Sequence, residues 1–206
     1  RLVQALSEQT AFQSVLYEDV NDPRGVALLL IAEDPALLVG PVRSFLNSEP
    51  FAALTPKPQF TMLGRSYALG YETDLEETVL RRPVRNALNP AWPWAVWYPI
   101  RRSGKFMQLP VEEQRKILSE HGQIGFAFGR HDLAHDIRLL CHGLDVNDSD
   151  FMVGLVSREL FPLSALVQTM RKTQQTALYL ERLGPFFVGH KVWASPLPAE
   201  LQSPAA

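Results

Sequence analysis

The sequence predicts an α+β fold with a largely antiparallel sheet, and three observations lead to that prediction. Strand-like and helix-like stretches are mixed along the chain without the regular βαβ alternation of parallel sheets. Two successive segments follow a similar order of elements, so two units side by side could form one continuous sheet or barrel. The 206 residues include 16 prolines, which favour many medium-length elements over a bundle of long helices.

The first segment is predicted to contain strands over residues 12–20, 26–32 and 60–69 and a helix over residues 35–47. The first two strands are rich in Val, Leu and Ile, and the turn-forming stretch from Asn21 to Gly25 separates them. Asp34 is well placed to be the N-cap of the helix, because its carboxylate can accept a hydrogen bond from the first turn. The charged, proline-containing stretch 72–93 is expected to be a linker.

The second segment is predicted to contain strands over residues 94–100, 137–141, 151–156 and 186–193 and helices over residues 110–120 and 163–183. Glu112 and Glu113 would lie in the first turn of the shorter helix, where carboxylates complement the helix dipole. Apolar residues recur near helical spacing from Leu163 to Ala177, which predicts the longer helix.

Composition excludes several classes of protein. The chain is 46% hydrophobic and 20% charged, with a net charge of −2 and a pI near 6.2, so no basic footprint of a nucleic-acid binder is present. Its single cysteine, Cys141, excludes an internal disulfide, and the longest apolar run, residues 26–32, is too short to cross a membrane. We expect a cytoplasmic protein, or a periplasmic one if a leader was removed before Arg1, where the numbering begins.

His121 has two interpretations. It follows the shorter predicted helix and precedes Gly122, which is typical of an ordinary helix C-terminus in which glycine supplies the left-handed residue. The functional alternative is an axial metal ligand presented by a helix, as in haem proteins.

Two further histidines, His131 and His135, are four residues apart, and each precedes an aspartate. On a helix the two imidazoles would share a face and could hold a metal ion, but the stretch is more typical of a solvated charged loop.

Arg138 interrupts an apolar strand, and alternation places it on one face with Leu140 and His142. A guanidinium facing a core needs an anion or an open cavity, whereas an edge-strand arginine faces solvent. Tyr98 lies near the end of another strand, and the cations Arg101 and Arg102 that follow it would suit a carboxylate.

Beyond these residues, the C-terminal half resembles the chlorite dismutase and coproheme decarboxylase family. The matching stretches, in order, are Tyr98-Pro99-Ile100-Arg101-Arg102-Ser103, residues 109–115, Glu120-His121-Gly122-Gln123-Ile124-Gly125, residues 138–142, Asp150-Phe151 and residues 184–189. The N-terminal half matches in its strand pattern and in Gly64-Arg65-Ser66-Tyr67, and its short length is similar to that of the dimeric branch of the family.

The resemblance implies a dimeric α+β barrel of two ferredoxin-like halves, with residues 1–85 as the N-terminal half, residues 93–195 as the haem-binding half and residues 196–206 as a tail. A homodimer is expected, and a pentamer is the alternative. The cofactor implied is haem b, with coproheme as the alternative.

The resemblance also assigns roles to single residues. His121 matches the proximal iron ligand, Arg138 the distal arginine of chlorite dismutases, and Tyr98 the tyrosine that becomes a radical in coproheme decarboxylases. An ungapped count from His121 would put Ala134 in the place of Arg138; the strand position favours Arg138. The residues expected to contact the cofactor besides His121 are Gln174, Arg171, Thr176 and Arg101.

Two departures from the family pattern bear on activity. Gln174 stands where chlorite dismutases pair the proximal histidine with a glutamate, so a neutral partner would donate less electron density to iron. Phe106 and Met107 stand where the family usually has tryptophans.

The function implied is a haem-dependent oxidoreductase that converts chlorite to chloride and dioxygen, with Arg138 holding the reactive anion in a dry pocket. The alternatives are a peroxide-dependent coproheme decarboxylase acting through Tyr98, and a haem carrier or a relic domain without cofactor. The partners expected are a small anionic substrate or peroxide, with neither nucleic acid nor membrane.

Overall fold

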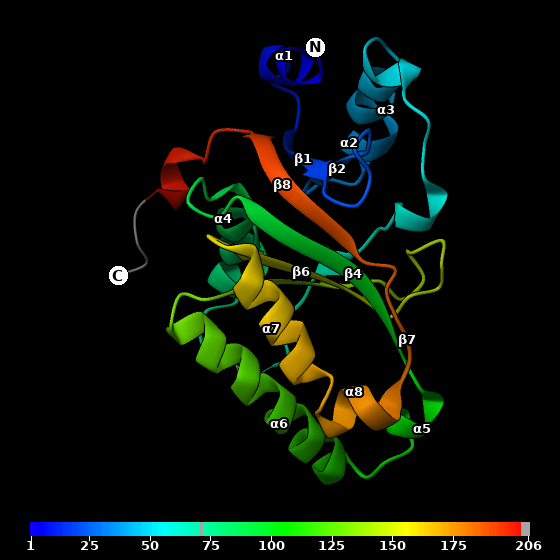
Figure 1. Cartoon of the computed structure of the whole chain (residues 1–206), viewed down its shortest axis with the longest axis vertical. Helices are drawn as coiled ribbons and strands as arrows, with labels where there is room; N and C mark the ends of the chain where they lie inside the picture. Colours follow the sequence, from blue (N-terminus) through cyan, green and yellow to red (C-terminus); the bar gives the residue numbers. More distant parts are fainter. Residues whose placement is uncertain (71, 203–206) are drawn as a thin grey trace.

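The computed structural model describes residues 1–70 and 72–202. They form an eight-stranded sheet in the order β2-β1-β8-β4-β6-β5-β3, and β7 also pairs with β4 (Figure 1). The strands are β1 (Gln13–Asp19), β2 (Val26–Ile31), β3 (Arg65–Ser66), β4 (Trp94–Arg102), β5 (His135–Leu140), β6 (Phe151–Ser157), β7 (Leu180–Leu183) and β8 (Phe187–Ala194). Every strand pair in this part of the chain is antiparallel, so the predicted α+β class with an antiparallel sheet is confirmed.

The helices are short except for one. They are α1 (Leu2–Glu8), α2 (Ala36–Val39), α3 (Pro41–Leu46), α4 (Arg82–Leu88), α5 (Gly104–Met107), α6 (Val111–Arg130), α7 (Leu160–Met170) and α8 (Gln174–Tyr179), with one-turn helices η1 (Phe51–Ala53), η2 (Pro58–Phe60) and η4 (Ala199–Leu201) and the π-helical turn η3 (Glu77–Arg81). In Figure 1, α1, α2 and α3 gather near β1 and β2, and α6, α7 and α8 lie together at the opposite end of the molecule.

The second segment folds as a ferredoxin-like unit. Its elements follow the order β4-α6-β5-β6-α7-β8, and its strands lie side by side in the order β8-β4-β6-β5. The first segment adds β1 and β2 beyond β8 and β3 beyond β5. The two segments therefore share one continuous sheet, while the limits 1–85, 93–195 and 196–206 stay predictions.

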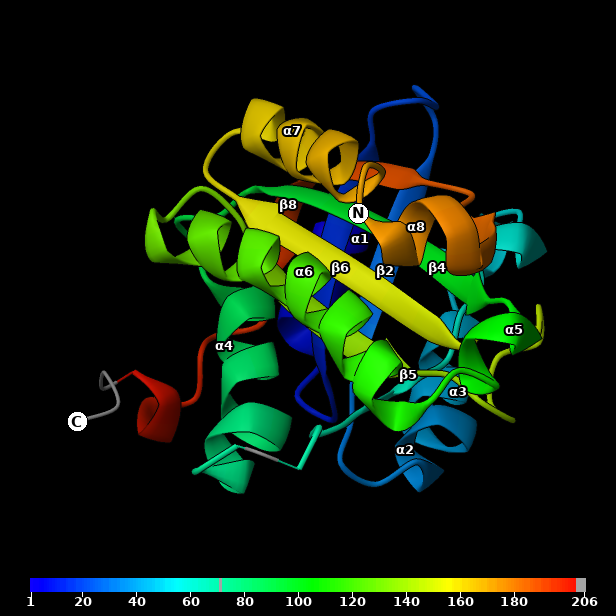
Figure 2. The ribbon, with the colours of Figure 1, turned by 90° about the horizontal axis from the view of Figure 1, so that it is seen from below.

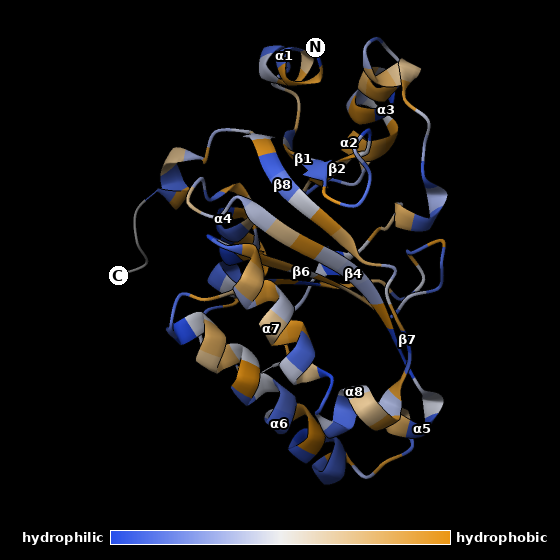
Figure 3. Cartoon of the chain, viewed as in Figure 1, coloured by the Kyte–Doolittle hydropathy of each residue, from blue (hydrophilic) through white to orange (hydrophobic). Residues whose placement is uncertain are grey.

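Three helices, α6, α7 and α8, lie on one face of the sheet (Figure 2). Hydrophilic and hydrophobic residues alternate along α6 and α7 (Figure 3), because one side of each helix packs against apolar neighbours and the other meets water. Their apolar residues form a core with Val96 and Tyr98 of β4 and Leu155 of β6.

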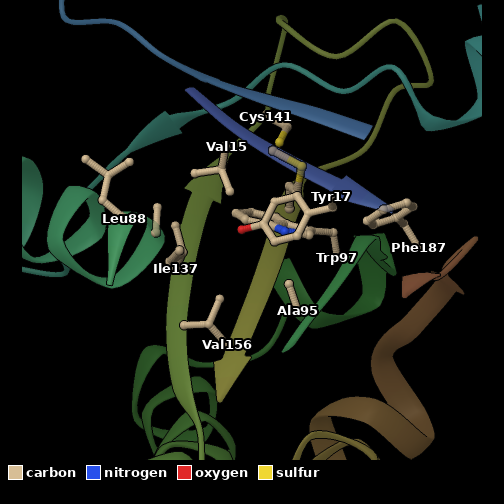
Figure 4. Packing of buried hydrophobic residues seen from close by; sticks show 11 residues of the cluster. Val15, Tyr17, Leu88, Ala95, Trp97, Ile137, Cys141, Val156 and Phe187 are labelled. Atoms are coloured by element: carbon tan, nitrogen blue, oxygen red, sulfur yellow. The ribbon is translucent and has the colours of Figure 1, made fainter. Parts of the chain in front are cut away.

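The opposite face of the sheet carries a second core, which α4 covers. Trp97 of β4, Tyr17 of β1 and Phe187 of β8 contribute its large rings (Figure 4). Trp97 lies directly across from Gly154 of β6, where any Cβ atom would overlap the indole ring. Glycine at this position is therefore required by packing.

The sequence-based elements of the first segment need two corrections. The helix predicted over residues 35–47 is divided at Gly40, whose φ of −104° and ψ of −103° are not helical; Asp34 does accept a hydrogen bond from the Ala36 N–H. The strand predicted over residues 60–69 is reduced to Arg65–Ser66, because the chain before it forms η2 and packs Phe60 and Met62 against the core.

The prediction of a linker over residues 72–93 was wrong for most of that stretch. Residues 77–88 are helical, and the proline that suggested a loop, Pro83, lies just after the π-helical turn η3, which continues directly into α4. The charged residues form ion pairs along these turns, Arg81 with Glu76 and Arg85 with Glu77.

Two helix boundaries in the second segment also differ from the prediction. The shorter helix, predicted to end near residue 120, continues to Arg130 because Ile124 and Phe128 pack against the core beneath it. The longer helix predicted over residues 163–183 is in fact α7, α8 and the strand β7. Among the described residues, no helix is both long and apolar enough to cross a membrane.

The contact between Trp97 and Gly154 gives a testable prediction. Gly154→Ala should lower the free energy of unfolding of the apo protein by about 1–3 kcal/mol, because an added methyl group overpacks the core. Gly122→Ala should raise it by as much as about 1 kcal/mol, because a methyl group in the middle of α6 has open space and alanine favours helix. Urea unfolding of both variants measures the two effects, and equal stability of the two would contradict this account of the sheet.

Candidate functional site

The site lies on the face of the sheet that α6 covers. Ala134, directly before β5, alternates onto one face with Asp136 and Arg138 of that strand, and Ala134 is buried in the core beneath α6 and α7. Tyr98 of β4 belongs to the same core and is 8% exposed. The predicted residues Tyr98, Arg138 and His121 are therefore brought to one face, from two strands and a helix.

His121 lies in the middle of α6, so the interpretation as an ordinary helix cap was wrong. Its imidazole is partly buried, and its Nδ1 atom lies 3.4 Å from Thr173 Oγ1. The Thr173 hydroxyl donates to the Met170 carbonyl at 2.8 Å, so it is an acceptor for an N–H on Nδ1. This arrangement favours the tautomer that leaves the Nε2 lone pair free to bind a metal.

The charge state of His121 fits the same role. Burial, followed by the nearby guanidinium groups of Arg102 and Arg138, holds the pKa of His121 below its usual value. A metal ligand must be a neutral imidazole, and these surroundings favour that form.

Thr173, and not Gln174, is the side chain that contacts the imidazole. Thr173 is 1% exposed and begins α8, where its Oγ1 accepts from the Thr176 N–H. Gln174 is exposed, and its backbone N–H donates to the Glu120 carboxylate at 3.0 Å. Glu120 and His121 of α6 therefore both contact the start of α8.

The two arginines at the end of β4 differ in their surroundings. Arg101 is held by ion pairs with Asp148 and with Glu181. Arg102 lies between the rings of Phe106 and Phe151, with its guanidinium carbon 4.9 and 4.5 Å from the two ring centroids.

Arg102 offers an unused hydrogen-bond donor. Its Nε is buried and has no hydrogen-bond partner within residues 1–70 and 72–202. Strand alternation from Tyr98 through Ile100 to Arg102 was the signal in the sequence that could have singled out Arg102 over Arg101.

A cavity of about 390 Å³ opens beside this arginine. Arg101, Arg102, Met107, His142 and Phe151 are among its lining residues. The Asp150 carboxylate accepts from the Arg102 backbone N–H at 2.7 Å and lies 3.3 Å from His142 Nε2, which fixes the rim of the cavity.

The remaining predicted contacts lie at the edge of the site. Arg171 is an exposed residue at the end of α7, and Thr176 is half-buried one turn into α8, with its hydroxyl 3.3 Å from that of Thr173. Their roles as cofactor contacts stay predictions.

The pair His131 and His135 does not form a shared site. His135 lies in β5, contacts Asp132 at 2.7 Å and stacks on Trp92 with 3.7 Å between ring centroids. His131 is exposed at the end of α6. Nowhere in the described part of the chain do three or more His, Cys, Asp or Glu residues gather to hold a metal ion.

These donors fit a porphyrin better than a bare metal ion. A protein site for zinc needs three or four ligands, whereas a haem supplies four nitrogens and needs one imidazole from the protein. His121 provides that imidazole, and the unpaired Nε of Arg102 and the rings of Phe106 and Phe151 suit the carboxylates and flat edge of a porphyrin.

The family comparison covers nearly the whole chain. A family model described as chlorite dismutase matches residues 3–192. A relative from Haloarcula marismortui, rrnAC3100, named as a candidate heme-binding protein, is 23% identical over 215 aligned residues; the match takes in 96% of this chain and 31% of that protein. The chain therefore spans about a third of the length of this curated relative.

Solved structures share the fold at low identity. A heme-binding protein from Thermus thermophilus is 22% identical, with a TM-score of 0.67 over 93% of this chain and 76% of that one. A variant chlorite dismutase from Candidatus Nitrospira defluvii, in complex with cyanide, is 17% identical, with a TM-score of 0.71 over 94% of this chain and 78% of that one.

The burial of Tyr98 gives a prediction for the pH dependence of stability. Burial raises the pKa of Tyr98 above its usual value of about 10, so the folded protein keeps the phenol neutral while the unfolded chain ionises it. Stability should fall as pH rises beyond about 10, and Tyr98→Phe should make this fall less steep. Urea unfolding between pH 8 and 11 measures it; an unchanged slope in Tyr98→Phe would show that the phenol is not buried.

Proposed function

Because this chain belongs to the chlorite dismutase family, we propose that it is a haem-dependent oxidoreductase in which His121 holds the iron. The observation that supports the proposal is the imidazole itself, which is partly buried, neutral and tied through Nδ1 to Thr173. Nε2 is left as the ligand atom. The names of the heme-binding relatives agree with this cofactor.

We propose haem b as the cofactor, with coproheme as the alternative. Either would supply a redox-active iron and carboxylates that need cationic partners. Arg102 is the best placed partner, because its Nε is buried and unpaired. Arg101, Arg171 and Thr176 are further out and complete the proposed set of contacts.

The residues of the sheet would act on the substrate. Arg138 would bind a small oxidant beside the cofactor, and the apolar core around Tyr98 would exclude water from it. The proposed reaction is turnover of chlorite or a related oxidant. The position of Tyr98 on the same face favours the second candidate, the peroxide-dependent decarboxylation of coproheme. In that reaction a tyrosine would be oxidised to a radical and would in turn oxidise the propionate.

We propose that the chain forms a homodimer, with a pentamer as the alternative, and that it acts on a small molecule. The chain spans about a third of the length of its curated relative, so any activity that depends on a longer protein is also a proposal.

The first test is reconstitution of the purified protein with haem b and with coproheme. Wild-type protein should bind one equivalent and give a Soret band, and His121→Ala should lose that band because the ligand is removed. His131→Ala, an exposed histidine on the end of the same helix, is the matched control and should bind as wild type.

Challenge of the reconstituted protein separates the candidate reactions. Release of oxygen from chlorite supports the first, and stepwise loss of mass from coproheme with peroxide supports the second. A Soret band without either reaction would leave a haem carrier, and equal binding by His121→Ala and wild type would overturn the ligand assignment.

The contact between Thr173 and His121 gives a second prediction. Thr173→Val keeps the shape of the side chain but removes the acceptor for Nδ1, so haem affinity should fall by about 10–100-fold. Thr169→Val is the control, since this hydroxyl donates to the Ala165 carbonyl within α7. Haem titrations of both variants measure the effect, and equal affinities would exclude a role for Thr173 in orienting the ligand.

A further inference from the structure

A carboxylate, that of Asp136, lies beside the arginine proposed to hold the substrate. Asp136 Oδ2 lies 2.8 Å from Arg138 Nε, and both residues alternate onto the face of β5 that α6 covers. Their side chains are 48% and 38% exposed, so the ion pair lies within reach of a small ligand.

Both members of the pair act electrostatically on the site. Burial and Arg102, followed by the Arg138 guanidinium, lower the pKa of His121, and burial followed by the Asp136 carboxylate raises the pKa of Tyr98. The pair therefore lies within electrostatic range of both groups. Asp136 and Arg138 also line a small polar hollow with Tyr67, Thr78 and Arg82.

A structural role for the carboxylate is not needed at this position. The backbone of Asp136 is already held by its partners in β6 and by the buried Asn86, whose side-chain amide donates to the Asp136 carbonyl at 3.1 Å. The carboxylate itself makes its contact with Arg138. Its direct contact therefore offsets the charge of that guanidinium.

We propose that Asp136 is a positioning residue that offsets the charge of Arg138 and so makes the site selective for an uncharged peroxide over an anion such as chlorite. An anion that approaches Arg138 must also approach the carboxylate, which repels it. Hydrogen peroxide carries no charge, and it can accept a hydrogen bond from the guanidinium while donating one to the carboxylate. This inference rests on the proposed haem function.

The test is ligand binding to the haem-reconstituted protein at neutral pH. Asp136→Asn should bind fluoride and azide about tenfold more tightly than wild type, since the repelling charge is gone. Imidazole, an uncharged ligand, should bind to both with the same constant. Asp132→Asn is the matched control: it breaks a similar contact, Arg158 Nε to Asp132 Oδ2 at 3.1 Å, outside the site.

A double-mutant comparison separates positioning from general effects on the fold. In an Arg138→Gln background the Asp136→Asn change should still raise fluoride affinity, because the carboxylate that repels the anion is removed there as well. Asp136→Ser is a second variant and should shift fluoride binding in the same direction. The ratio of kcat/KM for chlorite to that for peroxide should rise in both Asp136 variants.

The outcomes distinguish this inference from the function on which it rests. Failure of wild-type protein to bind haem would overturn the proposed function. Haem binding with the same fluoride constant in wild type and Asp136→Asn would overturn the role of Asp136 alone.

Discussion

The alternation of side chains along β4 is the constraint on which both faces of the molecule depend. Trp97 and Tyr98 are neighbours in sequence but point into different cores, one beneath α4 and one beneath α6. β4 pairs with β6, β7 and β8, so its register fixes the register of the strands around it. A slip of one residue would place the indole under α6 and remove the phenol from the site. Gly154, which alone leaves room for the Trp97 ring, opposes that slip.

The second requirement is the junction between α6 and α8, which orients His121 from outside its own helix. A side chain in the middle of a 20-residue helix has its direction set by the helix but not its ring angle or tautomer. Thr173 supplies the acceptor for Nδ1, and the Glu120 carboxylate holds the backbone N–H of Gln174. The break between α7 and α8 is therefore useful, because an unbroken helix could not present the N-cap hydroxyl of Thr173 to the imidazole.

The sequence was enough to predict six of the eight described strands, but not β7, the length of β3 or the contacts around the site. Apolar alternation predicted the bounds of β1, β2, β6 and β8 to within a few residues, because the burial of a strand depends on the pattern of neighbouring residues. The family resemblance pointed to Gln174 as the partner of His121, whereas the side chain that lies against the imidazole is that of the preceding residue, Thr173. A threonine N-cap before Gln174-Gln175-Thr176 was the local signal for a new helix start. The helix at residues 77–88 was missed because Pro83 suggests a loop until its position in the first turn is known.

Two features of the site, the Thr173 hydroxyl at His121 and the Asp136 carboxylate at Arg138, favour the same chemistry under the proposed function. A hydroxyl that accepts from Nδ1 leaves the proton on the imidazole, whereas a carboxylate would draw the proton away and make the ring a stronger electron donor. A guanidinium paired with a carboxylate presents little net charge to an incoming ligand, whereas an unpaired one attracts anions. Turnover of chlorite would need a strongly donating iron ligand and a cation whose charge is not offset. Thr173 at His121 and Asp136 at Arg138 would suit peroxide better, because binding that molecule requires hydrogen-bond partners and no excess of positive charge.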